Sequence, residues 1–212
     1  WGQANWLRML RKKIAVGTYS SSPTPDLAVT HQPPLTIWTL TDGTAGMRFQ
    51  AIALAEALCA RRGGSQHIDY IASPHRLLRS FPRLGRVAPW LPLFTSTDTH
   101  ADNSLASPPP SGAFPDILIT CGRRMAGVSI ALRARAQRAS HSMRTVHLQD
   151  PRLPPALFDL LVVPSHDPTR APNVVVSTGS INRLTPAQIT KAAQDLPAEW
   201  RRDDGHAPVA VM

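Results

Sequence analysis

The chain has 212 residues, of which 23 are basic and 14 acidic, and its net charge is +9 at pH 7. That length suits one α/β domain with additional segments. Two cysteines, Cys59 and Cys121, exclude a disulfide-rich scaffold and a cysteine zinc site, and they favour a reducing compartment. The eight histidines lack the spacing of metal ligands. The positive charge favours anionic ligands, but because no RNA-binding signature or helix-turn-helix pattern is present, we expect no nucleic-acid partner.

Residues 1–34 are expected to form a flexible basic tail. Residues 1–13 combine tryptophan, leucine and methionine with arginine and lysine, and a serine- and proline-rich stretch follows them. The segment is too short to span a bilayer, but its composition suits contact with an anionic membrane surface. A leader without structure of its own and a processed targeting sequence are open alternatives.

From residue 35 onward, apolar runs and amphipathic segments alternate. Strands are predicted at 35–41, 67–72, 116–121, 143–149, 158–163 and 174–177, and helices at 47–62, 74–83, 123–138 and 185–195. The 47–62 helix is expected to bury Phe49, Ile52, Ala53 and Leu58. The alternation predicts an α/β fold, a Rossmann-like parallel sheet with helices on both faces.

Composition also predicts the domain organisation. We expect a Rossmann-like domain over residues 35–200, interrupted by a polar, proline-rich mobile loop at 95–113. Residues 201–212 are interpreted as a linker and the first strand of a second domain. The sequence starts with Trp1 rather than Met, and it ends within the predicted strand at 201–212. We therefore interpret the chain as a fragment.

The first candidate site is the corner after the first strand, Asp42-Gly-Thr-Ala-Gly46. Gly43 and Gly46 permit a tight turn, and the helix that follows offers unpaired N–H groups to a phosphate or carboxylate. The spacing matches neither the three-glycine dinucleotide fingerprint nor a P-loop. A glycine-assisted connection without a ligand is therefore the alternative.

A second corner follows the 116–121 strand and carries Gly122, Arg123 and Arg124. Two cations in the first turn of a helix oppose the helix dipole, and an anion bound between the Gly122 N–H and a guanidinium would remove that conflict. The alternative is that both arginines pair with acids such as Asp116 or Asp150.

Three more corners follow the later strands, and each carries polar residues. Asp150 and Asp167 are candidates for a base or for holding a ligand hydroxyl, and His166 is a candidate proton carrier. Each Asp-Pro pair also suits a turn without a ligand. Arg152 is a candidate anion-binding residue in the third corner, and Asn182 and Arg183 are candidates in the fifth. Because ligands of parallel sheets bind beyond the carboxyl ends of the strands, all five corners point to one edge.

These segments occur in the order and spacing of a known family. The motifs are Thr41–Gly46 with Gln50, Cys121–Arg124, Leu148–Arg152, Val163–Asp167, and Pro172-Asn-Val with Gly179, Asn182 and Arg183. Over residues 35–212 the chain resembles the mitochondrial-fission, elongated-mitochondria-type family, whose bacterial members are often labelled nucleoside-diphosphate-sugar epimerases. Where family members commonly carry Lys after Asp-Gly and Glu before His-Asp, this chain has Thr44 and Ser165.

The resemblance implies the N-terminal half of a two-domain fold similar to GT-B glycosyltransferases. It implies a nucleotide-sugar-dependent glycosyltransferase that acts on a cell-envelope or lipid-linked acceptor, with the nucleotide sugar as co-substrate and no tightly bound cofactor. Asp42, Asp150 or Asp167 would be the base. We expect a cytoplasmic location, peripheral at the inner face of the membrane.

Two alternatives remain open. A non-catalytic adaptor for organelle fission would sit on the mitochondrial outer membrane. The epimerase label is a lesser alternative, because such enzymes use a three-glycine loop and a Tyr-x-x-x-Lys pair, and Tyr19 and Tyr70 are the only tyrosines here.

Overall fold

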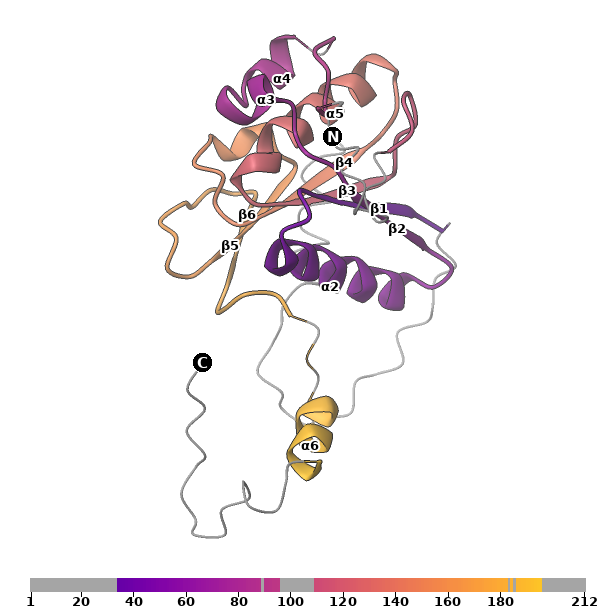
Figure 1. Ribbon diagram of the computed structural model, residues 1–212, viewed down its shortest axis with the longest axis vertical. Coiled ribbons are helices and arrows are strands. Elements are labelled where there is room, and N and C mark those ends of the chain that lie inside the picture. The colour runs from indigo at the N-terminus through magenta and orange to yellow at the C-terminus, as the bar shows by residue number, and fades with distance from the viewer. Residues whose placement is uncertain (1–33, 89, 96–108, 183, 185, 196–212) are drawn as a thin grey trace. The chain divides into compact units, whose positions relative to one another are not determined.

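Among the described residues, six strands pair in parallel in the order β2-β1-β3-β4-β5-β6 (Figure 1). The computed structural model describes residues 34–88, 90–95, 109–182, 184 and 186–195. The strands are β1 (Thr36–Thr41), β2 (Gln66–Ile71), β3 (Ile117–Cys121), β4 (Arg144–Leu148), β5 (Leu160–Pro164) and β6 (Val174–Ser177). The predicted Rossmann-like parallel sheet is thus confirmed, with strand bounds that differ by at most two residues from those expected.

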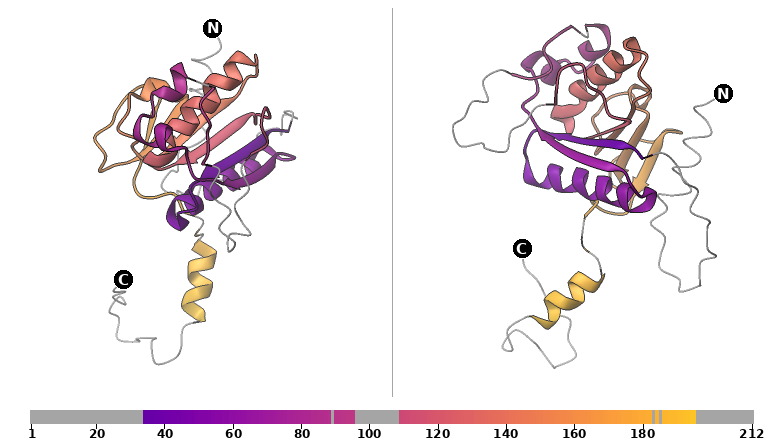
Figure 2. Two further views of the ribbon diagram at one scale, coloured as in Figure 1. Left: turned by 45° about the horizontal axis from the view of Figure 1, so that its top comes forward. Right: turned by 90° about the vertical axis from the view of Figure 1, so that its right-hand side faces the viewer.

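Helices cover both faces of the sheet, as predicted. Helix α2 (Ala45–Arg62) lies on one face, and α3 (Arg76–Ser80), α4 (Leu84–Val87) and α5 (Ala126–Arg138) lie on the other (Figures 1 and 2). The 3-10 turns η1 (Arg123–Met125) and η2 (Pro155–Leu157) precede α5 and β5. The predicted 123–138 helix therefore begins as a 3-10 turn. Only α3 lies within the predicted 74–83 helix, and α4 follows it in a segment for which no helix was predicted.

The chain divides into two units, residues 1–181 and 182–212. The sheet and helices α2 to α5 belong to the first unit, and α6 (Pro186–Gln194) belongs to the second. Apart from Pro34, the tail predicted at 1–34 lies outside the described residues, as do the predicted linker and strand at 201–212 and residues 96–108 of the predicted loop. Within the described part of the chain, no helix is long and apolar enough to cross a membrane.

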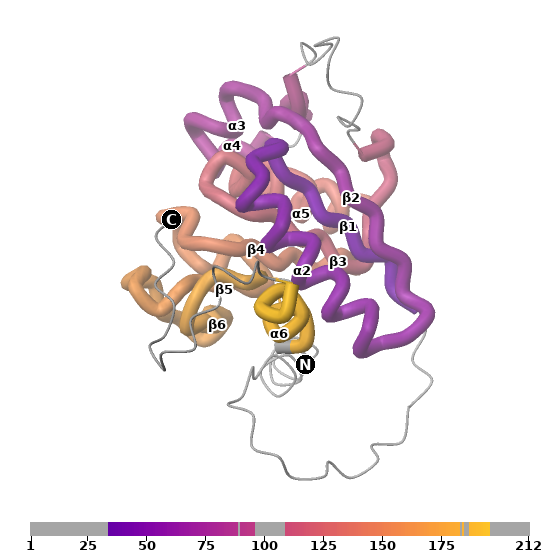
Figure 3. The backbone as a smooth tube through the Cα atoms, turned by 60° about the horizontal axis from the view of Figure 1, so that its bottom comes forward, coloured from indigo at the N-terminus to yellow at the C-terminus, as the bar shows by residue number. Residues whose placement is uncertain are grey.

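Helix α2 packs on β1, β2 and β3 through small side chains and leaves β5 and β6 to one side (Figure 3). Its buried face is centred on Ala51 and Ala55, four residues apart on one side of the helix. Of the residues expected there, Ala53 is buried, Ile52 and Leu58 are half-buried, and Phe49 is 56% exposed. The expected burial of Phe49 is wrong because its side chain lies about 200° around the helix from Ala51.

On the other face, the short helices α3 and α4 approach α5 at backbone distance. A Cβ built on Gly127 would lie 2.2 Å from the Leu78 carbonyl oxygen, and one built on Gly85 would lie 2.5 Å from the Gly127 carbonyl oxygen. Leu78 is fully buried in this contact. Because no side chain fits between these helices, they form one close-packed layer over β1 and β3.

His147 of β4 is buried on the α5 side of the sheet. Its Nδ1 shares a 2.8 Å hydrogen bond with the Thr120 hydroxyl, and its ring stacks on Phe158 with centroids 4.8 Å apart. Burial lowers the pKa of His147 to about 3, so the ring is neutral at pH 7. This histidine is part of the core.

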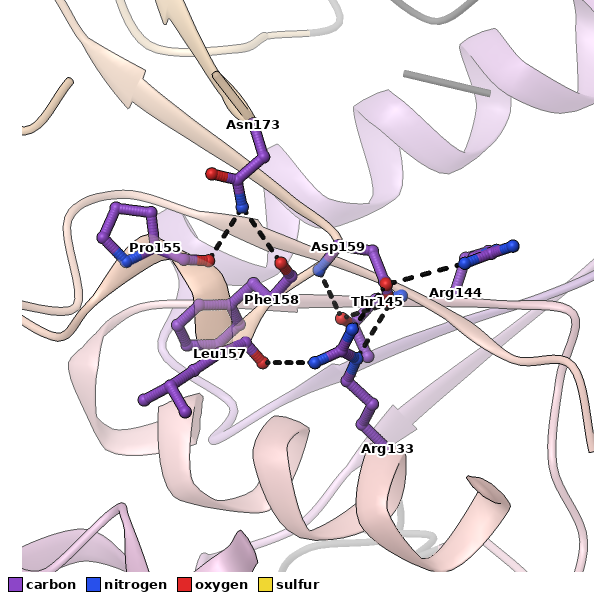
Figure 4. A network of polar contacts seen from close by, with 8 residues as sticks. All are labelled: Arg133, Arg144, Thr145, Pro155, Leu157, Phe158, Asp159 and Asn173. Carbon is purple, nitrogen blue, oxygen red and sulfur yellow. Dashed lines mark hydrogen bonds and ion pairs between the residues drawn. The ribbon is translucent and has the colours of Figure 1, made fainter. Parts of the chain in front are cut away.

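A polar network joins α5 to the start of β4 and to the residue before β5 (Figure 4). The Asp159 carboxylate accepts hydrogen bonds from Arg133 Nη2 at 2.8 Å, from the Thr145 N–H at 2.9 Å and from the Thr145 hydroxyl at 3.0 Å. Arg144 adds an ion pair at 3.7 Å. Since the carboxylate is only 8% exposed, it depends on these partners. The network fixes the end of the sheet at which β4 and β5 begin.

Candidate functional site

Three neighbouring strands are each followed by a residue with a positive φ. Gly43 after β1 has φ +85°, Gly122 after β3 has φ +83°, and Gln149 after β4 has φ +72°. Glycine adopts this conformation freely, whereas Gln149 carries strain there. The chain leaves β1 toward β2 on one side and returns to β3 on the other, so this edge is the topological switch point where ligands of such sheets bind.

A cavity of about 600 Å³ opens at this edge. Eight residues proposed from the sequence line it: Asp42, Gln50, Gly122, Arg123, Arg124, Asp150, His166 and Asp167. They come from the corners after β1, β3, β4 and β5 and from the first turns of α2. The structure therefore brings together residues that are spread over more than a hundred positions of the chain.

Two of the three candidate bases already have partners. The Asp42 Oδ1 accepts the Thr44 N–H at 3.1 Å, and its Oδ2 faces Arg124 Nη1 at 3.4 Å. The Asp150 carboxylate is 8% exposed and accepts the Arg152 N–H and the Thr169 hydroxyl, both at 2.8 Å. Both carboxylates hold the turns in which they lie, which is the role that an Asp-Pro or Asp-Gly turn predicts.

Asp167 differs from the other two carboxylates. Its carboxylate has no hydrogen bond or ion pair among the described residues, although it lines the same cavity. Its backbone N–H donates to the Pro164 carbonyl at 3.0 Å, and Arg170 donates to the carbonyls of Ser165 and Asp167. The loop after β5 is thus held by its backbone, and the Asp167 carboxylate takes no part in holding it; the exposed His166 lies next to it in the chain.

The cationic side of the cavity is formed by Arg123 and Arg124, both exposed. Arg124 faces Asp42 in an ion pair and is 57% exposed, whereas Arg123 Nε makes one long hydrogen bond of 3.5 Å to the Asp150 carbonyl. The Gly122 N–H donates to the Leu148 carbonyl at 3.1 Å, so it serves the sheet rather than an anion. Any anion bound here would contact the guanidinium groups.

The other proposed site residues do not line this cavity. Gly43 and Gly46 shape the first corner, and Arg152 is an exposed residue outside the cavity lining. Asn182 lies at the start of the second unit, where its side-chain oxygen accepts the Leu184 N–H at 3.0 Å. Arg183 lies outside the described residues.

Several lining residues were not expected from the sequence. Thr44, Gln149, Ser177 and Ser180 add polar groups; they lie in or next to the predicted corners but were not named as site residues, so sequence position would have been the signal. Met47 and Cys121 form an apolar wall, with their sulfur atoms 3.5 Å apart. Burial, with a smaller effect of nearby Asp42, raises the pKa of Cys121 to about 12, so this thiol stays protonated at pH 7.

The cavity thus combines two exposed cations, one unengaged carboxylate and several hydroxyl or amide groups. Such a set suits an anionic ligand that also carries hydroxyl groups, because guanidinium groups bind phosphate and a free carboxylate accepts a hydroxyl proton. Among the described residues, no three His, Cys, Asp or Glu side chains are grouped so that they could hold a metal ion.

Two comparisons with known proteins found matches. The family described as mitochondrial fission ELM1 matches residues 45–211. The chain is also similar to an uncharacterized protein of Rickettsia prowazekii (strain Madrid E), with 27% identity over 135 residues, which cover 63% of this chain and 32% of that protein. This chain thus spans about a third of the length of that relative. No solved structure matches. Because the family match covers well over half of the chain, the chain belongs to the mitochondrial fission ELM1 family.

Proposed function

We propose that this chain is the first Rossmann-like domain of a nucleotide-sugar-dependent glycosyltransferase with a GT-B-like architecture. The observation that carries the proposal is the unengaged Asp167 carboxylate in the same cavity as Arg123 and Arg124. Sugar transfer needs a base for the acceptor hydroxyl and positive charge for the diphosphate leaving group. Both are present within one cavity at the switch point of the sheet.

In the proposed reaction, Asp167 takes the proton of an acceptor hydroxyl while the hydroxyl oxygen attacks the anomeric carbon of the donor sugar. The bond from that carbon to the diphosphate oxygen breaks, and the nucleoside diphosphate leaves with the bonding electrons. Arg123 and Arg124 stabilise the negative charge that develops on it. Asp42 and Asp150 act through the turns they hold, because their oxygens are already engaged.

A second candidate is a non-catalytic adaptor in organelle fission, which the description of the family favours. Against it stands the similar protein of Rickettsia prowazekii. That organism is a bacterium and has no mitochondria to divide. An adaptor also has no need of a free carboxylate such as Asp167 in the same cavity as two arginines, Arg123 and Arg124. We therefore favour the transferase, with a lipid-linked or cell-envelope acceptor.

The proposal is tested by titrating the full-length protein, of which this chain would be the first domain, with uridine, guanosine and adenosine diphosphate sugars and following the heat of binding. We expect one of them to bind at or below millimolar concentration, and an Arg123→Gln/Arg124→Gln variant to bind it at least tenfold more weakly. Arg138→Gln is the matched control, because this exposed arginine lies at the opposite end of α5. If none of the nucleotide sugars binds at millimolar concentration, the transferase proposal fails.

A second measurement addresses the base. With the donor identified, Asp167→Asn should retain donor affinity but lower the transfer rate by at least a hundredfold, because general base catalysis contributes about that much. Asp195→Asn, an exposed carboxylate of the second unit, is the control. Equal rates for both variants would remove Asp167 from the mechanism.

A further inference from the structure

The outer surface of α3, α4 and the turn after them exposes large apolar side chains. Leu77 is 42% exposed, Phe81 61%, Val87 64% and Trp90 77%. They lie within fourteen consecutive positions of the sequence, in or next to α3 and α4, and these two helices lie on the face of the sheet opposite α2 (Figure 1). We call residues 76–88 together with Trp90 the α3–α4 surface. A concentration of exposed aromatic and branched side chains of this kind marks an interaction surface.

The same surface is strongly cationic. Arg76, Arg79, Arg83 and Arg86 are all exposed, and their guanidinium groups have no hydrogen bond or ion pair among the described residues. Residues 73–95 contain no aspartate or glutamate. Trp90 also lines an open hollow with Arg135, Arg138 and Ala139, which extends the positive charge onto α5. The partner of this surface must therefore be anionic.

The exposure of these apolar side chains does not reflect missing packing inside the fold. Leu78 is fully buried and Gly85 is buried against α5, with the close backbone approach to Gly127 described above. The inner side of α3 and α4 is thus already packed to contact distance. Leu77, Phe81, Val87 and Trp90 form a second apolar side that faces away from the core.

We propose that the α3–α4 surface docks onto an anionic lipid bilayer. Arginine next to exposed tryptophan and phenylalanine is the composition of segments that lie in the membrane interface, where the cations meet lipid phosphates and the aromatic rings enter the headgroup region. A protein partner would call for a more apolar centre with fewer unpaired charges, since charged residues are depleted there. The alternation of four arginines with four apolar side chains instead suits a surface that is negative over its whole area.

This proposal is independent of the nucleotide-sugar proposal, because it uses a different set of residues. It also differs from membrane contact by residues 1–13, which lie outside the described part of the chain. Vesicle binding and nucleotide-sugar binding are separate measurements, so either can fail alone. If both hold, the protein acts at a membrane surface on a substrate that the membrane carries.

The test is co-sedimentation of the whole chain with vesicles of phosphatidylcholine alone and with a third of phosphatidylglycerol added. We expect binding to the anionic vesicles only. Arg79→Gln/Arg83→Gln should lower the partition coefficient about 25-fold, because each arginine near an anionic surface contributes about 1 kcal/mol, or about fivefold. Phe81→Ser/Trp90→Ser should lower it at least tenfold, since two aromatic rings then no longer enter the interface.

Matched controls are Arg152→Gln/Lys191→Gln, which removes two exposed cations of other elements, and Phe49→Ser, which removes an exposed ring of α2. Each should change the partition coefficient less than threefold, and unchanged thermal midpoints verify that the surface variants fold. Equal losses in the controls and the surface variants would overturn the proposal, as would equal binding to both vesicle types. Binding to RNA but not to vesicles, lost in the surface variants, would overturn it in favour of nucleic acid.

Discussion

The contact between α3, α4 and α5 leads to an unusual expectation for Gly127, which lies in the second position of α5. Replacing glycine by alanine within a helix normally stabilises a protein by up to about 1 kcal/mol. Here the new Cβ would lie 2.2 Å from the Leu78 carbonyl oxygen, 2.9 Å from its carbonyl carbon and 3.1 Å from the Pro82 Cα. All three are backbone atoms, so no side-chain rotation relieves the overlap.

To restore ordinary contact, α3 would have to move away from α5 by about 1 Å, and the fully buried Leu78 would lose part of its packing. Overpacking of this kind costs about 1–3 kcal/mol. We therefore expect Gly127→Ala to lower the free energy of unfolding by about 2 kcal/mol, which corresponds to a drop in Tm of about 4–8 °C for a domain of this size. Thermal unfolding followed by circular dichroism measures it.

Gly46→Ala is the matched control, because Gly46 also lies near the start of a helix and keeps a negative φ, and a methyl group added there would meet no heavy atom within 4 Å. That variant should be unchanged or more stable by up to about 1 kcal/mol. If Gly127→Ala stabilised the protein as much as Gly46→Ala, the close approach of the two helix backbones would be refuted.

Three further expectations concern other parts of the core. Asp159→Asn should lower the free energy of unfolding by about 3 kcal/mol in a denaturant titration, because the partly buried Arg133 loses its anionic partner. The free energy of unfolding should fall between about pH 6.5 and pH 3 by up to about 1.4 kcal/mol per pH unit through His147, since the unfolded imidazole binds a proton there and the folded one does not. In iodoacetamide labelling at pH 8, the half-buried Cys59 should react while the buried Cys121, with its pKa of about 12, is protected until the protein unfolds.

Each of these has a control. Asp195→Asn, an exposed position just after α6, should leave stability unchanged, and an equal loss in both aspartate variants would count against the network at Asp159. His147→Gln should reduce the slope of the free energy of unfolding against pH, between pH 6.5 and pH 3, by the amount that one bound proton causes. An unaltered slope would show that another group titrates. Labelling of Cys121 as fast as Cys59 in native buffer would contradict its burial.

The sequence predicts the sheet well because buried parallel strands are short apolar runs separated by turn residues. Leu160–Pro164 and Val174–Ser177 have this pattern, and so does Ile117–Cys121. The gathering of the corners at one edge follows from parallel pairing alone, which is why Asp42, Arg123 and Asp150 could be assigned to one site.

Other features depend on tertiary contacts that no local pattern encodes. Phe49 has the apolar character of a core residue, yet the small Ala51 and Ala55 face the sheet, because a helix that lies close to strands needs small side chains there. Whether Asp42 and Asp150 are free or engaged is decided by hydrogen bonds to Arg124 and Thr169, which are 82 and 19 residues away. The difference between these carboxylates and Asp167 was therefore not accessible from residue type.

The position of β1 between β2 and β3 has a consequence for how the chain folds during synthesis. Ile37 pairs with Ile117, so one side of β1 has no neighbour until about eighty further residues have been made. Until then, its backbone groups and the apolar Trp38 and Leu40 form an open strand edge, which can pair with any other extended chain. Contacts this distant in sequence also form slowly. A nascent chain that stops before residue 117 should therefore aggregate or be held by chaperones, whereas one that reaches residue 121 can complete the strand.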